Sequence, residues 1–301
     1  DQEELDYWGL ETKNKWIEQE EELHDDNYTI PEDIKTKIEL GDLITFEKGG
    51  IEIHRLLCGD STNQGQVARL TAGQLFDLIV TDPPYNVDYT GGTGMTIQND
   101  KQTDENFYRF LFDFYTAFYE VTKPGRSWYV FHADSEGLNF RKAFIESGLL
   151  MKQCLIWVKN TLVMGRQDYQ WQHEPILYGW KPGDSHYFVN ARNNTTVIED
   201  EIDYSKMKKS ELLELIEQLQ EQPSTVIRAN KPTKNDLHPT MKPVELVGRL
   251  IKNSSKKGEI VGDAFIGAGS TMVAAHQLNR RCYGMELDPI YCQATTDRMK
   301  M

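Results

Sequence analysis

The sequence predicts an α/β protein in which helices cover both faces of a mostly parallel sheet. Residues 76–81 (FDLIVT) form a short apolar run with β-branched residues near its end, typical of a strand buried on both faces of a parallel sheet. Residues 260–286 read as strand, helix and strand, a parallel crossover that is right-handed by default. The 301 residues suffice for one large domain with an insertion, or for two modest domains.

The other elements follow from local patterns along the chain. Residues 51–57 alternate in polarity and end at Cys-Gly-Asp, which indicates a strand. Thr103 is followed by two acidic residues and then by aromatic residues at helical spacing, so a helix begins there and Pro124-Gly125 ends it. We expect further strands at 127–133, 153–159, 260–264 and 281–286, helices at 134–147, 210–222, 244–253 and 270–278, and irregular structure at 163–198.

The net charge of −14 looks unsuited to a nucleic-acid-binding protein, but the charge is segregated along the chain. Residues 1–47 carry −12, from 16 acidic and 4 basic side chains, and we expect an acidic, weakly structured extension there. Residues 199–222 hold eight acids against three lysines, whereas 223–257 hold eight lysines and arginines against two acids. A basic face for phosphate groups therefore stays open, beside the alternative of a solvated lysine-rich surface.

The four cysteines, Cys58, Cys154, Cys282 and Cys292, are scattered and form no C-x-x-C pair or zinc-finger spacing. We therefore predict no metal and no disulfide, as in a protein of a reducing cytosol. No apolar run approaches the roughly 18 residues that a membrane-spanning helix needs, and no signal-peptide pattern opens the chain. Because the first residue is Asp1 rather than Met, we expect the chain to be a piece of a longer protein.

A glycine turn lies between a predicted strand and a predicted helix at 265–269 (FIGAG). Glycines there allow a tight turn and a close approach of a ligand to the backbone. Glu286, 19 residues after Gly267 and at the end of the next strand, can accept hydrogen bonds from both ribose hydroxyls of an adenosine group. The turn lacks the third glycine of a dinucleotide fingerprint and the Gly-Lys-Ser/Thr of a phosphate loop. This favours an adenosine ligand without a pyrophosphate; the alternative is a plain tight turn.

Asp82-Pro83-Pro84-Tyr85 stands at the carboxyl end of the buried strand, the edge where open α/β sheets bind ligands. Two prolines leave a stiff backbone without amide donors, so a carboxylate, a fixed carbonyl and an aromatic ring project into one place. Asp82 and the Pro83 carbonyl can accept from the two N–H groups of an exocyclic amine. Tyr85 can stack on a base that has left the duplex. The alternative is a rigid turn after a strand.

These motifs resemble those of the amino-group DNA methyltransferases. DPPY is similar to their catalytic motif, residues 263–271 (DAFIGAGST) to their S-adenosylmethionine loop, and 238–243 (HPTMKP) to the segment before that loop in the beta class. That class has the catalytic motif first, then the target recognition region, then the cofactor loop, and this chain has the same order. The resemblance, which covers 51–301, implies a Rossmann-like methyltransferase sheet with a circularly permuted motif order and an inserted recognition region.

The resemblance divides the chain into an acidic extension at 1–47, a first catalytic part at 48–162, a target recognition region at 163–237 and a second catalytic part at 238–301. It implies methyl transfer from S-adenosylmethionine to N6 of a flipped-out adenine in double-stranded DNA. It also implies a cytoplasmic, nucleoid-associated enzyme of a bacterial or phage-infected cell, of the restriction-modification kind and without a membrane partner. A homodimer and a ParB-like domain upstream stay open.

The resemblance also implies roles for single residues, with Asp82, Pro83, Pro84 and Tyr85 as the catalytic group. Asp60 matches the acid that receives the cofactor's adenine amino group, and Thr240 and Lys242 match residues near the cofactor's carboxylate. For Lys242 the alternative is a surface lysine at a helix start. The implied cofactor-binding residues are Asp60, Thr240, Lys242, Asp263, Phe265, Gly267, Gly269, Ser270, Thr271 and Glu286.

Three aromatic residues, Tyr169, Trp171 and His173, line the pocket of the flipped base or form a structural cluster.

Two positions depart from the family. Ala264 stands where the family often has Pro or a larger residue, and Ile266 where it often has a small one. Neither departure removes a glycine, so we expect cofactor binding to survive.

The residues also separate this reaction from its rivals. Carbon-5 methylation of cytosine needs a Pro-Cys thiolate, and the sequence has no Pro-Cys. Cytosine-N4 methylation stays open, although Asp rather than Ser before Pro-Pro-Tyr favours adenine. An oxidoreductase with an adenosine cofactor is disfavoured by the two-glycine loop and DPPY. An inactive DNA-binding relic is disfavoured because Asp82, Tyr85, Gly267 and Gly269 are all present.

Overall fold

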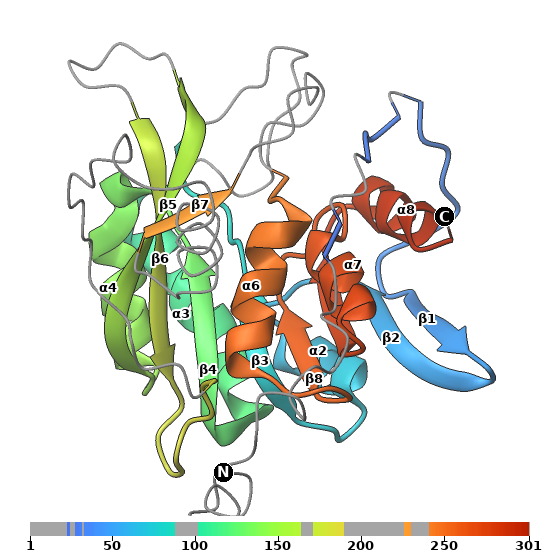
Figure 1. Ribbon diagram of the computed structural model, residues 1–301, viewed down its shortest axis with the longest axis horizontal. Helices are drawn as coiled ribbons and strands as arrows, with labels where there is room; N and C mark the ends of the chain where they lie inside the picture. The colour runs from blue at the N-terminus through green and yellow to red at the C-terminus, as the bar shows by residue number, and fades with distance from the viewer. Residues whose placement is uncertain are drawn as a thin grey trace, which may run out of the picture.

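The computed structural model describes residues 23–24, 28–31, 33–87, 102–163, 171–189, 226–229 and 241–300. Within these residues the strands form one nine-stranded sheet in the order β1-β2-β9-β8-β3-β4-β6-β5-β7 (Figure 1). The strands are β1 (Leu43–Lys48), β2 (Ile51–Cys58), β3 (Phe76–Thr81), β4 (Thr122–Phe131), β5 (Leu150–Val163), β6 (Trp171–Trp180), β7 (Val226–Ala229), β8 (Ile260–Asp263) and β9 (Arg281–Glu286).

The sheet is mostly parallel, as the sequence predicts. Strands β2, β9, β8, β3 and β4 run in one direction as consecutive neighbours. Strand β6 is antiparallel to both β4 and β5, β1 is antiparallel to β2, and β7 is parallel to β5. The carboxyl ends of five adjacent strands therefore meet at one edge of the sheet, and the predicted motifs follow those ends.

Helices cover both faces of the sheet (Figure 1). The helices are α2 (Gln64–Thr71), α3 (Asp104–Glu120), α4 (Gly137–Glu146), α6 (Val244–Ser254), α7 (Ser270–Gln277) and α8 (Pro289–Arg298), with a short 3₁₀ turn η2 (Asp134–Glu136) before α4. Helices α2, α3 and α4 pack into one core cluster, and α6, α7 and α8 contribute to the cluster on the other face. Strand β3 shows why the apolar run is needed, because Leu78 and Val80 enter one cluster and Ile79 enters the other.

The predicted start of α3 is confirmed, but its predicted end is wrong. The Thr103 hydroxyl accepts a hydrogen bond from the Asn106 amide at 3.4 Å, and the helix begins at the next residue. It ends at Glu120, before Pro124-Gly125, which lies inside β4. There the pairing of β4 with β3 shifts register, and Gly125 has a φ of +73°. The Gly125 amide bonds the Lys181 carbonyl at 2.8 Å, so tertiary pairing holds this segment.

The expectation of irregular structure at 163–198 is wrong for residues 171–180. They form β6, which lies inside the sheet between β4 and β5. The backbone of β6 forms hydrogen bonds with both β4 and β5. This pairing determines that the segment is a strand, although its local sequence pattern does not indicate one. Part of the predicted recognition region thus belongs to the sheet. The predicted helix at 210–222 lies outside the described residues.

The predicted weak structure of 1–47 is wrong at the end of that segment, although the described residues before Leu43 form no helix or strand. Residues 43–48 form β1, which pairs with β2, and the side chains of Tyr28 and Ile30 are buried. The Tyr28 hydroxyl donates to the Ala294 carbonyl on α8 at 3.2 Å. Apolar side chains therefore attach the described part of this acidic segment to the core, although its composition favours disorder.

Two short helices, α2 and α8, were not predicted from the sequence. Helix α8 carries a local signal, since Asp288 accepts from the Ile290 amide at 2.8 Å and Pro289 occupies the first helical position. Among the described helices, none combines the length and hydropathy that a membrane crossing requires. The described residues contain no cluster of three or more metal-ligating side chains, and the four cysteines are unpaired.

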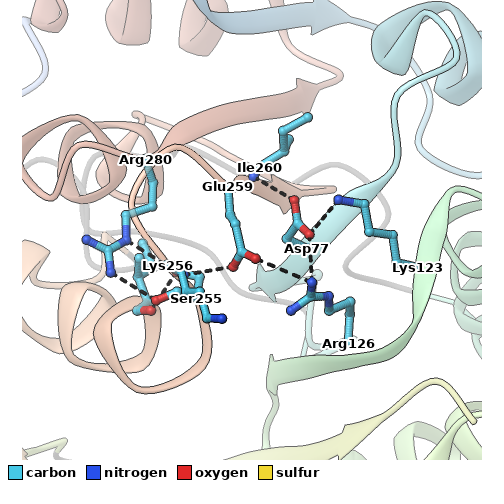
Figure 2. Close-up of polar contacts among 9 residues, drawn as sticks. Asp77, Lys123, Arg126, Ser255, Lys256, Glu259, Ile260 and Arg280 are labelled. Atoms are coloured by element: carbon cyan, nitrogen blue, oxygen red, sulfur yellow. Dashed lines mark hydrogen bonds and ion pairs between the residues drawn. The ribbon is translucent and has the colours of Figure 1, made fainter. Parts of the chain in front are cut away.

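A polar network ties β3 to β4 and β8 at the end of the sheet opposite to the predicted motifs (Figure 2). The Asp77 carboxylate contacts Lys123 at 2.7 Å and Arg126 at 3.3 Å, both from the irregular part of β4, and accepts from the Ile260 amide at 3.1 Å. Arg126 also contacts Glu259 at 3.3 Å. Because the Asp77 side chain is only 3% exposed, its charge depends on these partners.

Asp77→Asn is expected to lower the free energy of unfolding by about 1–3 kcal/mol, because the two cations then lose their shared counter-charge. The value is reduced from that of a fully buried pair since Lys123 stays 41% exposed. Urea denaturation measures the change. A loss below about 0.5 kcal/mol would show that the network contributes little to stability.

Candidate active site

Neighbouring parallel strands bring the predicted motifs to one edge of the sheet. Strand β3 leads into Asp82, and its neighbour β8 leads into the glycine loop at 265–269. Strand β9, next to β8, ends at Glu286, and β2, next to β9, leads into Asp60. The structure thus joins motifs that are far apart in the sequence, at the edge where open α/β sheets bind ligands.

The DPPY motif holds its carboxylate and its tyrosine against each other. The Tyr85 hydroxyl donates to Asp82 Oδ1 at 2.6 Å, and the Tyr85 ring meets Phe140 of α4 edge-on at 6.4 Å between centroids. Burial, together with the carboxylates of Asp82 and Glu174, raises the pKa of Tyr85 well above its usual value. The hydroxyl therefore stays protonated and donates a hydrogen bond to Asp82.

Lys242 contacts the carboxylate of the DPPY motif. Its ammonium contacts Asp82 Oδ2 at 2.5 Å and donates to the Tyr85 hydroxyl at 3.1 Å, and its side chain is 8% exposed. The surface alternative for Lys242 is therefore wrong. The structure places its charge at Asp82, whereas the resemblance placed it near the cofactor's carboxylate. Burial would lower the pKa of Lys242, but Asp82 and Glu174 together hold it above its usual value, so the amine is charged.

Glu174 is a member of this cluster that the sequence analysis did not select. It lies on β6, and its Oε2 is 3.3 Å from the Lys242 ammonium and accepts from the Tyr85 hydroxyl at 3.3 Å. The available signal was a carboxylate directly before Pro175 and the mostly apolar run that follows it on the same strand, in the stretch HEPILYGW. That signal could not be read while the segment was expected to be irregular.

The glycine loop has the backbone that its sequence predicts. Gly267 and Gly269 have φ values of +53° and +85°, the left-handed region that favours glycine. A Cβ added at Gly269 would come within 2.9 Å of Thr295, whereas one at Gly267 would meet no atom within 4 Å. The backbone at Gly267 is therefore open to a ligand, and the backbone at Gly269 is packed against α8.

Glu286 lies directly beside this loop. One carboxylate oxygen accepts from the Gly267 amide at 3.0 Å and the other from the Asp288 amide at 2.9 Å. Each oxygen keeps a further lone pair, so two ribose hydroxyls can be accepted. Burial raises the pKa of Glu286 to about 7. The open backbone and this carboxylate fit the adenosine part of S-adenosylmethionine.

Asp263 is buried and holds the loop rather than facing it. Its Oδ1 accepts from the Thr81 hydroxyl at 2.8 Å and from the Phe265 amide at 3.1 Å, and its side chain is 3% exposed. Burial raises its pKa to about 6. These bonds link the loop to the strand that carries DPPY, so Asp263 can fix the distance between the two motifs.

Helix α8 holds the loop from behind. The Thr295 hydroxyl donates to the Gly267 carbonyl at 2.8 Å, and the Arg298 guanidinium donates to the Ala268 carbonyl at 2.8 Å. Arg298 also contacts the Ser270 hydroxyl at 3.3 Å. Two loop carbonyls are thus occupied by protein donors, which fixes the loop against α8.

The remaining predicted residues lie around this edge or outside the described chain. Asp60 is exposed beyond β2, where its Oδ1 accepts from the Thr62 amide at 2.9 Å, and the neighbouring Gly59 amide bonds the Glu286 carbonyl at 2.8 Å. Phe265 packs on Phe114 at 5.0 Å between ring centroids. The further predicted residues Ser270 and Thr271 are buried at the start of α7, Trp171 and His173 form an edge-on pair at 5.6 Å, and Thr240 and Tyr169 lie outside the described residues.

Comparison with known families decides what this arrangement belongs to. The model of the N6/N4 DNA methylase family matches residues 76–297, which span both DPPY and the cofactor loop. The chain belongs to this family. Its members are S-adenosylmethionine-dependent enzymes that methylate an amino group of adenine or of cytosine in DNA. The predicted family and the predicted fold are confirmed.

Curated relatives of this DNA methylase include restriction-modification enzymes. The chain is 26% identical over 229 residues to the type II methyltransferase M.BglII of Bacillus subtilis, a match that covers 71% of this chain and 61% of that protein. It is 24% identical over 253 residues to M.HpaI of Haemophilus parainfluenzae, which covers 81% of this chain and 74% of that protein. The chain thus spans about three fifths of the length of M.BglII.

Solved structures share the fold. The M1.HpyAVI–S-adenosylmethionine complex has a TM-score of 0.59 at 20% identity, and the match covers 83% of this chain and all of that one. PvuII DNA methyltransferase, which is cytosine-N4-specific, has a TM-score of 0.58 at 14% identity over 82% of this chain and 86% of that one. At these sequence identities the similarity to the solved structures shows only that the fold is shared. It does not distinguish an adenine-specific enzyme from a cytosine-specific one.

Proposed function

We propose that this DNA methylase is site-specific and transfers a methyl group from S-adenosylmethionine to N6 of a flipped-out adenine in double-stranded DNA. The proposal is carried by the Asp82 carboxylate, which Tyr85 and Lys242 hold at the carboxyl end of β3. The loop suited to adenosine follows β8, the strand beside β3. A carboxylate acceptor and a methyl-donor site are the two parts that methylation of an amine requires.

The chemistry needs position and hydrogen-bond acceptors, and it needs no protein nucleophile. When bound, S-adenosylmethionine supplies a methyl group on a positively charged sulfur. Asp82 and the Pro83 carbonyl accept from the two N–H groups of the target, which draws the amine lone pair out of the ring and aims it along the methyl–sulfur axis. The amine nitrogen would bond to the methyl carbon as the S–C bond breaks, the electron pair of that bond would stay on sulfur as a neutral thioether, and the methylated amine would release one proton to solvent. Tyr85 stacks on the base, which must leave the duplex first.

Adenine is proposed over cytosine because an Asp precedes Pro-Pro-Tyr, the feature that favours adenine in the family resemblance. Cytosine-N4 methylation uses the same acceptors on the same class of amine. The resemblance of the fold to a cytosine-N4 enzyme makes it the alternative that the experiment has to separate.

The deciding experiment is mass spectrometry of nucleosides from unmethylated double-stranded DNA incubated with the protein and S-adenosylmethionine. N6-methyladenine is the expected product, and its absence from DNA incubated without the cofactor is the control. N4-methylcytosine instead would keep the reaction and overturn the base. No modified base, in DNA of varied sequence, would contradict the proposed activity.

Further expectations from the resemblance stay predictions. They are target recognition by residues of 163–237, the roles of the individual cofactor-binding residues, a homodimer, an upstream ParB-like domain, and association with the nucleoid. Mutation of the segment at 181–189, which follows β6, would show by altered site preference whether recognition lies there.

A further inference from the structure

The active-site cluster holds one more carboxylate than the proposed chemistry uses. Asp82 and Glu174 both contact the single ammonium of Lys242, at 2.5 Å and 3.3 Å. Their side chains are 22% and 17% exposed, so solvent screens these charges only in part. With all three groups ionised, the cluster carries one net negative charge. We next consider where that charge is needed during methyl transfer.

The two carboxylates share the same two donors. Lys242 and the Tyr85 hydroxyl both contact Asp82, and both also contact Glu174. Each donor lies closer to Asp82, with distances of 2.5 Å and 2.6 Å against 3.3 Å and 3.3 Å. In this structure the Lys242 ammonium therefore occupies a carboxylate oxygen of Asp82 that a target amine would use. Glu174 is a second acceptor within reach of the same ammonium.

An ammonium at Asp82 opposes the reaction. The target nitrogen gains positive charge as its bond to the methyl carbon forms, and two cations held on one carboxylate repel each other strongly in a partly buried site. If the ammonium moves to Glu174, the negative charge of Asp82 is left for the nitrogen that becomes cationic. The Lys242 charge then remains paired, which a buried ammonium requires.

We propose that Glu174 is a positioning residue for methyl transfer, because it receives the Lys242 ammonium when the target amine binds Asp82. This inference rests on the proposed methylation of an exocyclic amine, and it holds for adenine and cytosine alike. Glu174 touches neither the methyl group nor the base in this role. It acts through Lys242 and keeps Asp82 available.

The first test is Glu174→Gln, which keeps the size of the side chain and removes its charge. We expect kcat to fall about ten- to a hundredfold while the dissociation constant for S-adenosylmethionine stays within about twofold, because the cofactor loop is unchanged. Glu259→Gln is a matched control, since Glu259 is 18% exposed, also faces a cation, and lies at the opposite end of the sheet (Figure 2). Wild-type kcat in Glu174→Gln would overturn the inference.

The second test asks whether Glu174 acts through Lys242. In the Lys242→Met background, Glu174→Gln is expected to cause no further loss of kcat, because the ammonium to be moved is gone. An equal loss in both backgrounds would show that Glu174 acts independently and would overturn the inference. A wild-type protein that methylates no base would instead contradict the proposed function. In that case thermal unfolding of wild type, Glu174→Gln, Lys242→Met and the double variant still tests whether Glu174 pairs with Lys242. Additive changes in Tm would overturn this pairing.

Discussion

Asp82→Asn is expected to lower the rate of methyl transfer on the order of a thousandfold or more while cofactor affinity stays within about tenfold. The asparagine keeps one acceptor oxygen, but it replaces the other with an amide that donates. That amide would face either the Lys242 ammonium at 2.5 Å, which can only donate, or the Tyr85 hydroxyl at 2.6 Å, which would have to turn its own hydrogen away from the amide. The variant also removes the negative charge that the reacting amine needs. Asp82→Ala, which lacks any acceptor, is expected to abolish turnover.

Single-turnover kinetics on DNA of mixed sequence measures the rate, and titration calorimetry measures the affinity for S-adenosylmethionine. Asp77→Asn is the matched control, because it makes the same change near the start of β3, whereas Asp82 directly follows the end of that strand. It is expected to lose stability and to keep its turnover at a temperature where it stays folded. Turnover of Asp82→Asn near that of wild type would remove Asp82 from the proposed mechanism.

Glu286→Ala is expected to weaken the binding of S-adenosylmethionine about a hundredfold, because the carboxylate that we propose to accept the ribose hydroxyls is lost. The loop itself also loses a contact, since Glu286 accepts from the Gly267 amide at 3.0 Å. Glu286→Gln keeps an acceptor and the side-chain volume, and its loss of affinity is expected to be smaller. Calorimetry on the protein without DNA measures both variants, and an affinity of Glu286→Ala within threefold of wild type would contradict the assignment.

Cofactor affinity is also expected to depend on pH through the same carboxyl group. Burial raises the pKa of Glu286 from 4.5 to about 7 in the folded protein, so the stability that its protonated form gives is present below about pH 4.5 and is lost as the pH rises through about 7. Binding has the opposite dependence, because the ionised carboxylate is the better acceptor. The dissociation constant is therefore expected to rise about three- to fivefold between pH 8.5 and pH 6.5.

Glu286→Gln should remove this pH dependence, because the amide does not titrate. Asp263, the carboxyl group that links the loop to the DPPY strand, has a pKa of about 6 and is roughly a quarter protonated at pH 6.5, so any pH dependence left in Glu286→Gln is expected to come from it. Equal pH profiles for wild type and Glu286→Gln would assign the dependence to another group.

Local sequence was sufficient for several segments that carry their own signal. The run at 76–81 predicted β3, because only a strand buried on both faces needs apolar side chains at every step. The glycine loop and Glu286 were predicted together, because a strand–turn–helix–strand unit places the end of its second strand beside the turn. Local patterns missed α2, α8 and β6. Helix α2 has only eight residues, and β6 passes through Pro175, a residue that disfavours a central strand.

The sequence by itself determined the fold class, the order of the motifs and the chemistry that DPPY and the cofactor loop can perform. Tertiary structure alone decided that Lys242 and Glu174 meet at Asp82, because they come from the start of α6 and the middle of β6, on separate elements. Ion pairs of this kind depend on distance and burial, and neither quantity is encoded in the spacing of residues along the chain. The antiparallel insertion of β6 between β4 and β5 brings Glu174 into the site, and backbone pairing with two neighbours is its physical cause.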